Sequence, residues 1–133
     1  MDKLELIKLA IEARKLAYIP YSHFAVGAAI LTKDNKVFKG ANVENSSYPC
    51  GICAERNALY HAMMEGYKKD DFEALVIVAD TDEPCSPCGM CRQVISELFP
   101  LDKPIYLANL KGDVKETNVN ELLPFAFSES DLK

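Results

Sequence analysis

The chain has 133 residues, of which 49% are hydrophobic and 26% charged, and its formal net charge is −5. This length and composition predict one soluble globular domain covering residues 1–133. No apolar run approaches the roughly 18 residues of a membrane-spanning helix, and the charged N-terminus lacks a signal-peptide core, so a cytoplasmic protein without a membrane partner is expected. The acidic balance, with no cluster of Lys or Arg, argues against nucleic acid as a partner and favours a small molecule.

Residues 2–17 carry the apolar spacing of an amphipathic helix. Asp2 is a suitable N-cap residue for it. Leu4, Ile7 and Ile11 are expected to share one buried face, and the apolar side is widened by Leu6, Leu9, Ala10 and Ala13. We interpret this helix as structural cover rather than as part of a site.

Residues 25–31 and 37–43 predict a β-hairpin, because turn-forming residues at 33–36 separate two strand-like runs. Gly27 and Gly40 lie inside these strands. A glycine inside a strand often marks the close approach of a ligand or of another backbone. One of these contacts is therefore expected on the hairpin.

The rest of the chain alternates between helical and strand patterns. We predict a helix over 54–65, then a strand over 74–79 and a helix over 89–99. Two strands follow, over 104–110 and 114–119, and a short closing element covers 121–127. This order predicts an α/β fold, a three-layer α/β/α sandwich around a mixed five-stranded sheet, with right-handed crossovers. Both cysteine segments then begin helices near the carboxyl ends of strands, where sites form.

A polar loop over residues 42–49 connects the hairpin to the first cysteine segment. One interpretation is a solvated loop. The other is the wall of a polar pocket, because loops held by a rigid scaffold carry binding groups. The residue types favour the two interpretations equally.

Five cysteines are many for a chain expected in a reducing compartment, where structural disulfides are rare. Metal binding or catalysis explains them better. Cys88 and Cys91 are three residues apart and so share one face of a helical turn, while Cys53 can add a third ligand from the other helix start. Three protein ligands and a water molecule are the arrangement of a catalytic zinc ion.

Two charged residues follow Cys53 directly. Glu55 could accept a proton from a metal-bound water molecule, because the thiolates leave it no need to bind the metal itself. Three thiolates would leave the zinc centre too negative to be a good Lewis acid unless charge is withdrawn from the sulfurs. We predict that Arg56 donates to a thiolate, with Arg92 as a weaker candidate and a solvent-exposed Arg56 as the alternative.

Two other classes of protein remain open from the cysteines alone. Cys85, Cys88 and Cys91 follow part of a ferredoxin-type spacing, which would indicate an iron–sulfur electron carrier. That class leaves Glu55 unexplained. A purely structural zinc module would need a fourth ligand, which Cys50 or Cys85 could supply.

The pairing of Cys-x-Glu with Pro-Cys-x-x-Cys is the three-cysteine form of the zinc deaminase signature. On this pattern the chain resembles the small, homotetrameric class of cytidine deaminases. The matching segments are residues 21–29, 40–45, 48–56, 86–93 and 121–124. The resemblance spans nearly the whole chain in the same order, and it implies the cytidine deaminase-like fold.

The resemblance also implies roles at the metal centre. Cys53, Cys88 and Cys91 match the zinc ligands, with one Zn²⁺ per subunit. Glu55 matches the residue that moves protons. The backbone N–H of Ala54 matches a contact to the pyrimidine ring, together with the Glu55 carboxylate.

Further matches lie in the substrate pocket. Phe24 matches an aromatic wall beside the base, and Asn42 and Glu44 match the groups that hold the ribose hydroxyls. Ser46 and Tyr48 fall where the family reaches into the pocket of a neighbouring subunit. These assignments are implied by the family and not by the spacing of the residues.

Phe127 matches a C-terminal aromatic residue that closes a pocket, with Phe125 as a second aromatic nearby. The implied activity is zinc-dependent hydrolytic deamination of cytidine and 2′-deoxycytidine to uridine and 2′-deoxyuridine plus ammonia, in pyrimidine salvage. The implied assembly is a homotetramer with shared active sites.

Overall fold

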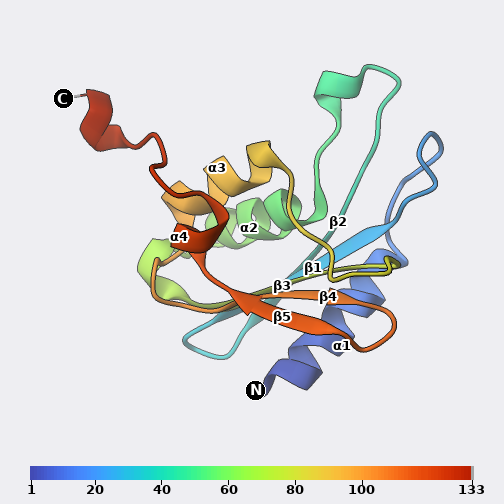
Figure 1. Cartoon of the computed structure of the whole chain (residues 1–133), viewed down its shortest axis with the longest axis horizontal. Coiled ribbons are helices and arrows are strands. Elements are labelled where there is room, and N and C mark those ends of the chain that lie inside the picture. The colour runs from blue at the N-terminus through green and yellow to red at the C-terminus, as the bar shows by residue number, and fades with distance from the viewer. Residues whose placement is uncertain (133) are drawn as a thin grey trace.

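Five strands form one mixed sheet in the order β2-β1-β3-β4-β5. The computed structural model describes residues 1–132 (Figure 1). The strands are β1 (Val26–Thr32), β2 (Val37–Ala41), β3 (Phe72–Ala79), β4 (Ile105–Asn109) and β5 (Val114–Thr117). Among the strands within residues 1–132, β3 and β4 pair in parallel, and the other neighbouring strands are antiparallel. The predicted mixed five-stranded sheet is confirmed.

Helices cover both faces of the sheet (Figure 1). Helix α1 (Lys3–Arg14) packs on one face, where Leu6 and Ala10 join a cluster with Val76 and Val78 of β3. The other face is covered by α2 (Ala54–Met64), α3 (Gly89–Leu98) and α4 (Val119–Leu122). The three-layer α/β/α architecture is therefore confirmed. None of the helices within residues 1–132 has the length and apolar character needed to cross a membrane.

Helix α1 begins as predicted and buries part of its predicted apolar side. The Asp2 carboxylate caps it by accepting a hydrogen bond of 2.9 Å from the Glu5 amide. The buried residues are Leu6, Ile7, Ala10 and Ala13. Leu4 is exposed, so its predicted burial is wrong. The buried residues follow the helical spacing of three and four residues from Leu6 onward. Leu4 lies outside the part of the helix surface that contacts the sheet.

The hairpin brings two helices into direct contact with its backbone. A Cβ atom added to Gly27 would lie 2.0 Å from the carbonyl oxygen of Ala10, and one added to Gly40 would lie 2.3 Å from that of Ala54. Any side chain at these positions would displace a helix backbone. The close approach expected at both glycines is therefore to another backbone, and Gly40 sets the position of the start of α2.

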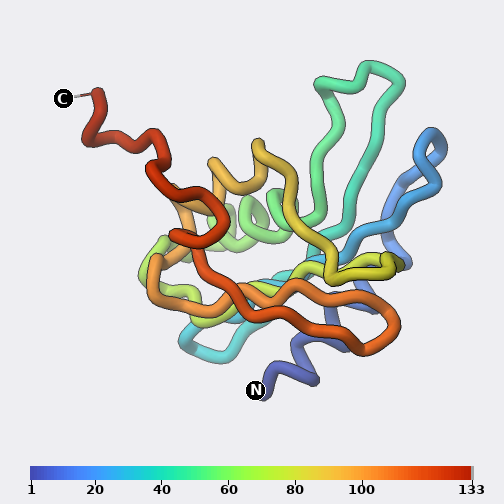
Figure 2. The backbone as a smooth tube through the Cα atoms, in the orientation of Figure 1, coloured from blue at the N-terminus to red at the C-terminus, as the bar shows by residue number. Residues whose placement is uncertain are grey.

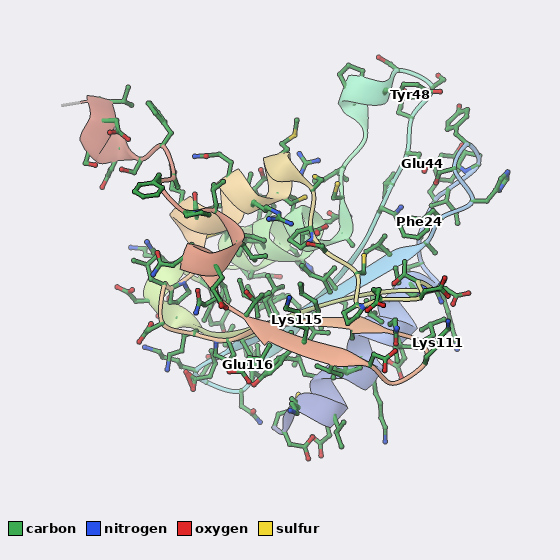
Figure 3. All side chains as sticks on the ribbon, in the orientation of Figure 1. Phe24, Glu44, Tyr48, Lys111, Lys115 and Glu116 are labelled. Carbon is green, nitrogen blue, oxygen red and sulfur yellow. The ribbon has the colours of Figure 1, made fainter. Side chains whose placement is uncertain are left out.

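The closing element predicted over 121–127 is displaced toward the N-terminus. Asn118 caps α4 by accepting a hydrogen bond of 3.0 Å from the Glu121 amide, so the helix starts at Val119. It ends at Leu122, close before Pro124, because the residue before a proline is disfavoured in helical conformation. The strand that precedes it, β5, is an edge strand whose exposed Lys115 and Glu116 (Figure 3) discourage pairing with other chains.

Two loops project beyond the sheet on the same side of the molecule (Figure 2). They comprise residues 18–25, before β1, and residues 42–53, after β2; the second contains a short 3₁₀ helix, η1 (Tyr48–Cys50). Their backbones are joined, because the Tyr18 amide donates to Asn42 (3.0 Å) and the Glu44 amide donates to Tyr18 (2.9 Å). The C-terminal segment leaves the body on the side away from both loops (Figure 2).

Candidate metal centre and substrate pocket

Three thiols meet where two helices begin. Cys53 is the N-cap of α2, Cys88 is the N-cap of α3 and Cys91 lies in the first turn of α3. Their sulfur atoms all lie within 4.8 Å of one another, and the Sγ atoms of Cys53 and Cys88 are 3.8 Å apart. Tetrahedral zinc with Zn–S bonds of about 2.3 Å places two sulfur ligands roughly 3.8 Å apart. The three thiols therefore fit a zinc ion with one position left for another ligand.

The thiols differ in their readiness to lose a proton. A hydrogen bond from Cys91 and the neighbouring Arg56 guanidinium lower the pKa of Cys53 to about 5. The same hydrogen bond and burial raise the pKa of Cys91. Both helix N-termini favour negative charge at these positions. These pKa shifts favour the thiolate at Cys53 over Cys91, and zinc binding requires each ligand as a thiolate.

Arg56 lies beside the cluster. Its Nη2 atom donates to the Sγ atom of Cys53 at 3.6 Å. Within residues 1–132, its Nε atom is buried and has no hydrogen-bond partner. The guanidinium group thus lies where it can withdraw electron density from a sulfur ligand, as the charge argument requires.

Arg92 makes a different set of contacts. Its three donors reach the Pro87 carbonyl (2.9 Å), the Leu122 carbonyl (2.8 Å) and the Ser86 hydroxyl (2.7 Å). These bonds tie the segment before Cys88 to the end of α4. Arg92 therefore positions a ligand segment through its backbone, whereas Arg56 donates to a sulfur atom.

Glu55 lies in the first turn of α2 and is only 3% exposed. Burial raises the pKa of its carboxyl to about 7, from an ordinary value of 4.5. A group with a pKa near neutrality can both take and give protons efficiently. The preceding residue, Ala54, opens the helix, so its amide has no partner within α2 and is available to another acceptor.

The two remaining cysteines lie outside the thiol cluster. Among residues 1–132, the group of potential metal ligands comprises Cys53, Cys88 and Cys91 and includes neither Cys50 nor Cys85. Cys50 is exposed, and Cys85 packs against the apolar core. Burial raises the pKa of Cys85 to about 11, which disfavours the thiolate form that metals bind.

The polar loop forms one wall of a pocket. The pocket has a volume of about 410 Å³, and Asn42, Glu44 and Tyr48 line it together with Cys53 and Arg56. The structure therefore supports the interpretation of this loop as a pocket wall rather than as a solvated loop only.

Asn42 is partly used within the chain. Its Oδ1 atom accepts from the Val26 amide (2.9 Å), and its Nδ2 atom donates to the Phe24 carbonyl (2.8 Å). Because a primary amide offers two donors and two lone pairs, one of each remains for a ligand. Asn42 can thus bind a polar group while fixing the start of β1.

Glu44 is held by the neighbouring loop. Its Oε1 atom accepts from the amides of Tyr21 (3.0 Å) and Ser22 (3.1 Å), and its Oε2 atom accepts from the Ser22 hydroxyl. These bonds, of which the Ser22 hydroxyl contributes most, lower the pKa of Glu44. No role for Ser22 follows from the sequence, in which it is only one member of the matching segment 21–29.

The remaining predicted pocket residues are spread over the surface. Figure 3 shows Phe24, Glu44 and Tyr48 on the projecting loops, with Tyr48 farthest from the sheet. Phe24 is 42% exposed and Tyr48 is 79% exposed, and Ser46 is exposed as well. Tyr48 therefore lines the pocket beside Cys53 while most of its side chain stays exposed, and Ser46 is not among the residues that line that pocket.

The C-terminal segment, to which Phe127 belongs in the sequence, lies away from the projecting loops (Figure 2). The Phe127 side chain is 57% exposed, and its carbonyl accepts from the Gln93 side chain at 3.0 Å. Nearby Phe125 is fully exposed and has a φ of 56°, in the left-handed region that aromatic residues rarely adopt. Neither aromatic ring lines the pocket beside Cys53 of the same chain.

Comparison with known proteins decides the family. The sequence model described as "Cytidine and deoxycytidylate deaminase zinc-binding region" matches residues 1–107. The chain belongs to this family. It is 54% identical to the cytidine deaminase of Halalkalibacterium halodurans, over 99% of this chain and 98% of that protein. It is 52% identical to the cytidine deaminase of Sporosarcina psychrophila, over 99% of this chain and 96% of that protein.

The fold agrees with that of the cytidine and deoxycytidylate deaminase family. The crystal structure of cytidine deaminase from Burkholderia pseudomallei matches with a TM-score of 0.93 and 49% identity, over 96% of this chain and 100% of that one. The matched zinc-binding region contains Cys53, Cys88 and Cys91, whose sulfur atoms form the cluster. Membership of a zinc-binding family removes the iron–sulfur alternative.

Proposed function

We propose that the chain catalyses the hydrolytic deamination of cytidine and 2′-deoxycytidine to uridine and 2′-deoxyuridine, with release of ammonia and one zinc ion per subunit. The observation that supports this most is the buried Glu55 in the same helical turn that follows Cys53, at a cluster of three thiols within 4.8 Å. The full-length similarity to proteins named cytidine deaminase supports the same reaction.

In the proposed mechanism Cys53, Cys88 and Cys91 hold the zinc ion, which when bound supplies a water molecule of lowered pKa as the nucleophile. Glu55 takes a proton from the attacking water and delivers it to N3 of cytosine, which makes C4 electrophilic. Once the oxygen of this water has bonded to C4, Glu55 takes its remaining proton and passes it to the exocyclic nitrogen, which leaves as ammonia as the C4–N bond breaks. The free amide of Ala54 orients the ring beside Glu55.

In the proposed pocket Phe24 packs beside the base, and Asn42 and Glu44 accept hydrogen bonds from the ribose hydroxyl groups. The lowered pKa of Glu44 keeps its carboxylate charged at neutral pH. A carboxylate beside the ribose would repel a 5′-phosphate. This charge and the net charge of −5 favour a free nucleoside over a nucleotide or a nucleic acid.

We further propose that the chain forms a homotetramer in which Ser46, Tyr48 and Phe127 complete the active sites of neighbouring subunits. Support comes from their exposure, since Tyr48 is 79% and Phe127 is 57% exposed, and Phe127 does not line the pocket beside Cys53 of its own chain. Exposed aromatic residues are enriched at protein interfaces.

The proposed setting is a single catalytic domain, residues 1–133, that serves pyrimidine salvage in the cytoplasm. The relatives are covered almost end to end, which supports one domain. All five cysteines are free thiols. A zinc site made of thiols is easiest to maintain in a reducing compartment, which supports the cytoplasm.

A substrate panel tests the proposed reaction. Purified protein with measured zinc content is offered cytidine, 2′-deoxycytidine, CMP, adenosine and cytosine, and the ammonia released is quantified. Turnover of the first two alone is the expected result, because the pocket must recognise both the ring and an unphosphorylated sugar. Preferential turnover of CMP or of adenosine would contradict the proposal.

Replacing Arg56 by Gln is expected to lower kcat by about 10- to 100-fold, the range typical of groups that support metal ligands. The reason is that Cys53 would lose the donor at 3.6 Å and leave the metal centre more electron-rich. Arg56→Lys is the matched variant, because it keeps the charge and should recover part of the activity. Wild-type kcat in both variants, with zinc content measured, would refute the charge argument.

A further inference from the structure

Ser22 links two segments of the proposed pocket through one hydroxyl group. Its Oγ atom donates to the Oε2 atom of Glu44 and accepts from the Phe24 amide at 3.0 Å. Because the Phe24 N–H occupies an acceptor position of the hydroxyl, the Ser22 hydrogen is free to point at Glu44. The hydroxyl therefore has a defined direction.

The acceptor positions of Glu44 can be counted. A carboxylate offers about four lone-pair sites, two on each oxygen. The amides of Tyr21 and Ser22 fill those of Oε1, and the Ser22 hydroxyl takes one on Oε2. About one site remains, and it lies on the oxygen that the Ser22 hydroxyl holds.

The loop that carries Ser22 is itself fixed relative to Glu44. The Glu44 amide donates to the Tyr18 carbonyl at 2.9 Å, and the His23 amide closes the loop by donating to the Ile19 carbonyl at 3.1 Å. His23 has a φ of 57°, which bends the chain between Ser22 and Phe24. The donor and the carboxylate thus belong to one connected unit rather than to two independent loops.

We propose that Ser22 is a positioning residue for substrate recognition: its hydroxyl orients the Glu44 carboxylate so that the one open acceptor position of Oε2 faces a sugar hydroxyl of the nucleoside. This inference rests on the proposed function, in which Glu44 binds the ribose. Ser22 touches neither the base nor the reacting atoms in this scheme, and it acts through Glu44 alone.

The test compares a substrate that has the sugar hydroxyls with one that lacks them. Ser22→Ala is expected to lower kcat/KM for cytidine on the order of tenfold, mainly through a higher KM, because a hydrogen bond to a charged group is lost. For 2′,3′-dideoxycytidine the loss should stay below about twofold, since that substrate has no hydroxyl for Glu44 to bind. Ser22→Thr keeps the hydroxyl and should restore the cytidine value.

Two further measurements keep the result interpretable. Ser96→Ala removes a hydroxyl that bonds within α3, to the Gln93 carbonyl at 2.7 Å, and should leave both substrates unaffected. Inhibition constants provide a test that does not need turnover of a poor substrate. Ser22→Ala should weaken inhibition by uridine, which has the sugar hydroxyls, and should leave inhibition by 2′,3′-dideoxyuridine nearly unchanged.

The outcomes separate this inference from the proposed function. If wild-type protein does not deaminate cytidine, the proposed function fails. If wild type is active but Ser22→Ala loses equal activity on both substrates, or loses zinc and helical circular dichroism, Ser22 has a structural role and the inference is overturned. A loss confined to the substrate with sugar hydroxyls, restored by Ser22→Thr, establishes it.

Discussion

Replacing Glu55 by Gln is expected to lower kcat for cytidine by about 10²–10⁴-fold, the usual contribution of a general acid/base. Gln has the same size as Glu and suits a position that is 3% exposed, so the fold should tolerate it. It cannot take a proton from water or pass one to N3 and to the leaving amine. Steady-state kinetics together with zinc determination by mass spectrometry measure both parts of the expectation.

Retention of zinc is the decisive companion measurement for Glu55→Gln. In the proposed site the three thiolates hold the metal, so the variant should still bind one zinc ion per chain. Glu65→Gln is a matched control, because Glu65 lies at the exposed end of the same helix, where its contact is with His61 at 3.8 Å. A Glu55→Gln protein with more than a tenth of wild-type kcat would rule out the assigned role.

Replacing Cys88 by Ser is expected to remove most of the bound zinc and to lower activity by more than about 100-fold, beyond the range seen for groups that only support a ligand. Cys88 is the exposed member of the cluster, so this change disturbs packing less than a change at buried Cys91. A hydroxyl is a poorer ligand for zinc than a thiolate. Zinc content after dialysis and kcat/KM for cytidine give the two readouts.

Cys50→Ser and Cys85→Ser are the matched controls for Cys88. Both change one thiol to a hydroxyl outside the cluster, and both should retain zinc and activity. Loss of metal from either control would indicate a fourth protein ligand and hence a closed, structural zinc site. That result would also remove the open position on which the proposed reaction depends.

The cluster of three cysteines could be predicted in part because local spacing determines which side chains share a helical turn. Cys88 and Cys91 are three residues apart, and Cys53 is followed by Glu55 and Arg56 within one helical turn. A helix start fixes the relative positions of such residues regardless of what surrounds it. The sheet was equally predictable, since the continuous apolar run of β3 requires cover on both faces.

Other features depend on contacts that no local pattern encodes. The exposure of Leu4 follows from the angle at which α1 meets the sheet, and several apolar residues of that helix compete for the same contact. The bond from Ser22 to Glu44 joins residues 22 positions apart through loops without periodicity. The closing element expected over 121–127 is a helix that starts earlier, at Val119, because Asn118 caps it.

The close contact between Gly40 and the first turn of α2 has a consequence for how the active site tolerates sequence change. With no side chain between them, the strand and the helix that carries Glu55 approach so closely that an added Cβ atom at Gly40 would lie 2.3 Å from the Ala54 carbonyl oxygen. Substitutions among the apolar residues of the core can then alter the free energy of unfolding while leaving this spacing unchanged. The position of the first turn of α2 is therefore expected to tolerate substitutions in the core. It is expected to be sensitive to any substitution of Gly40.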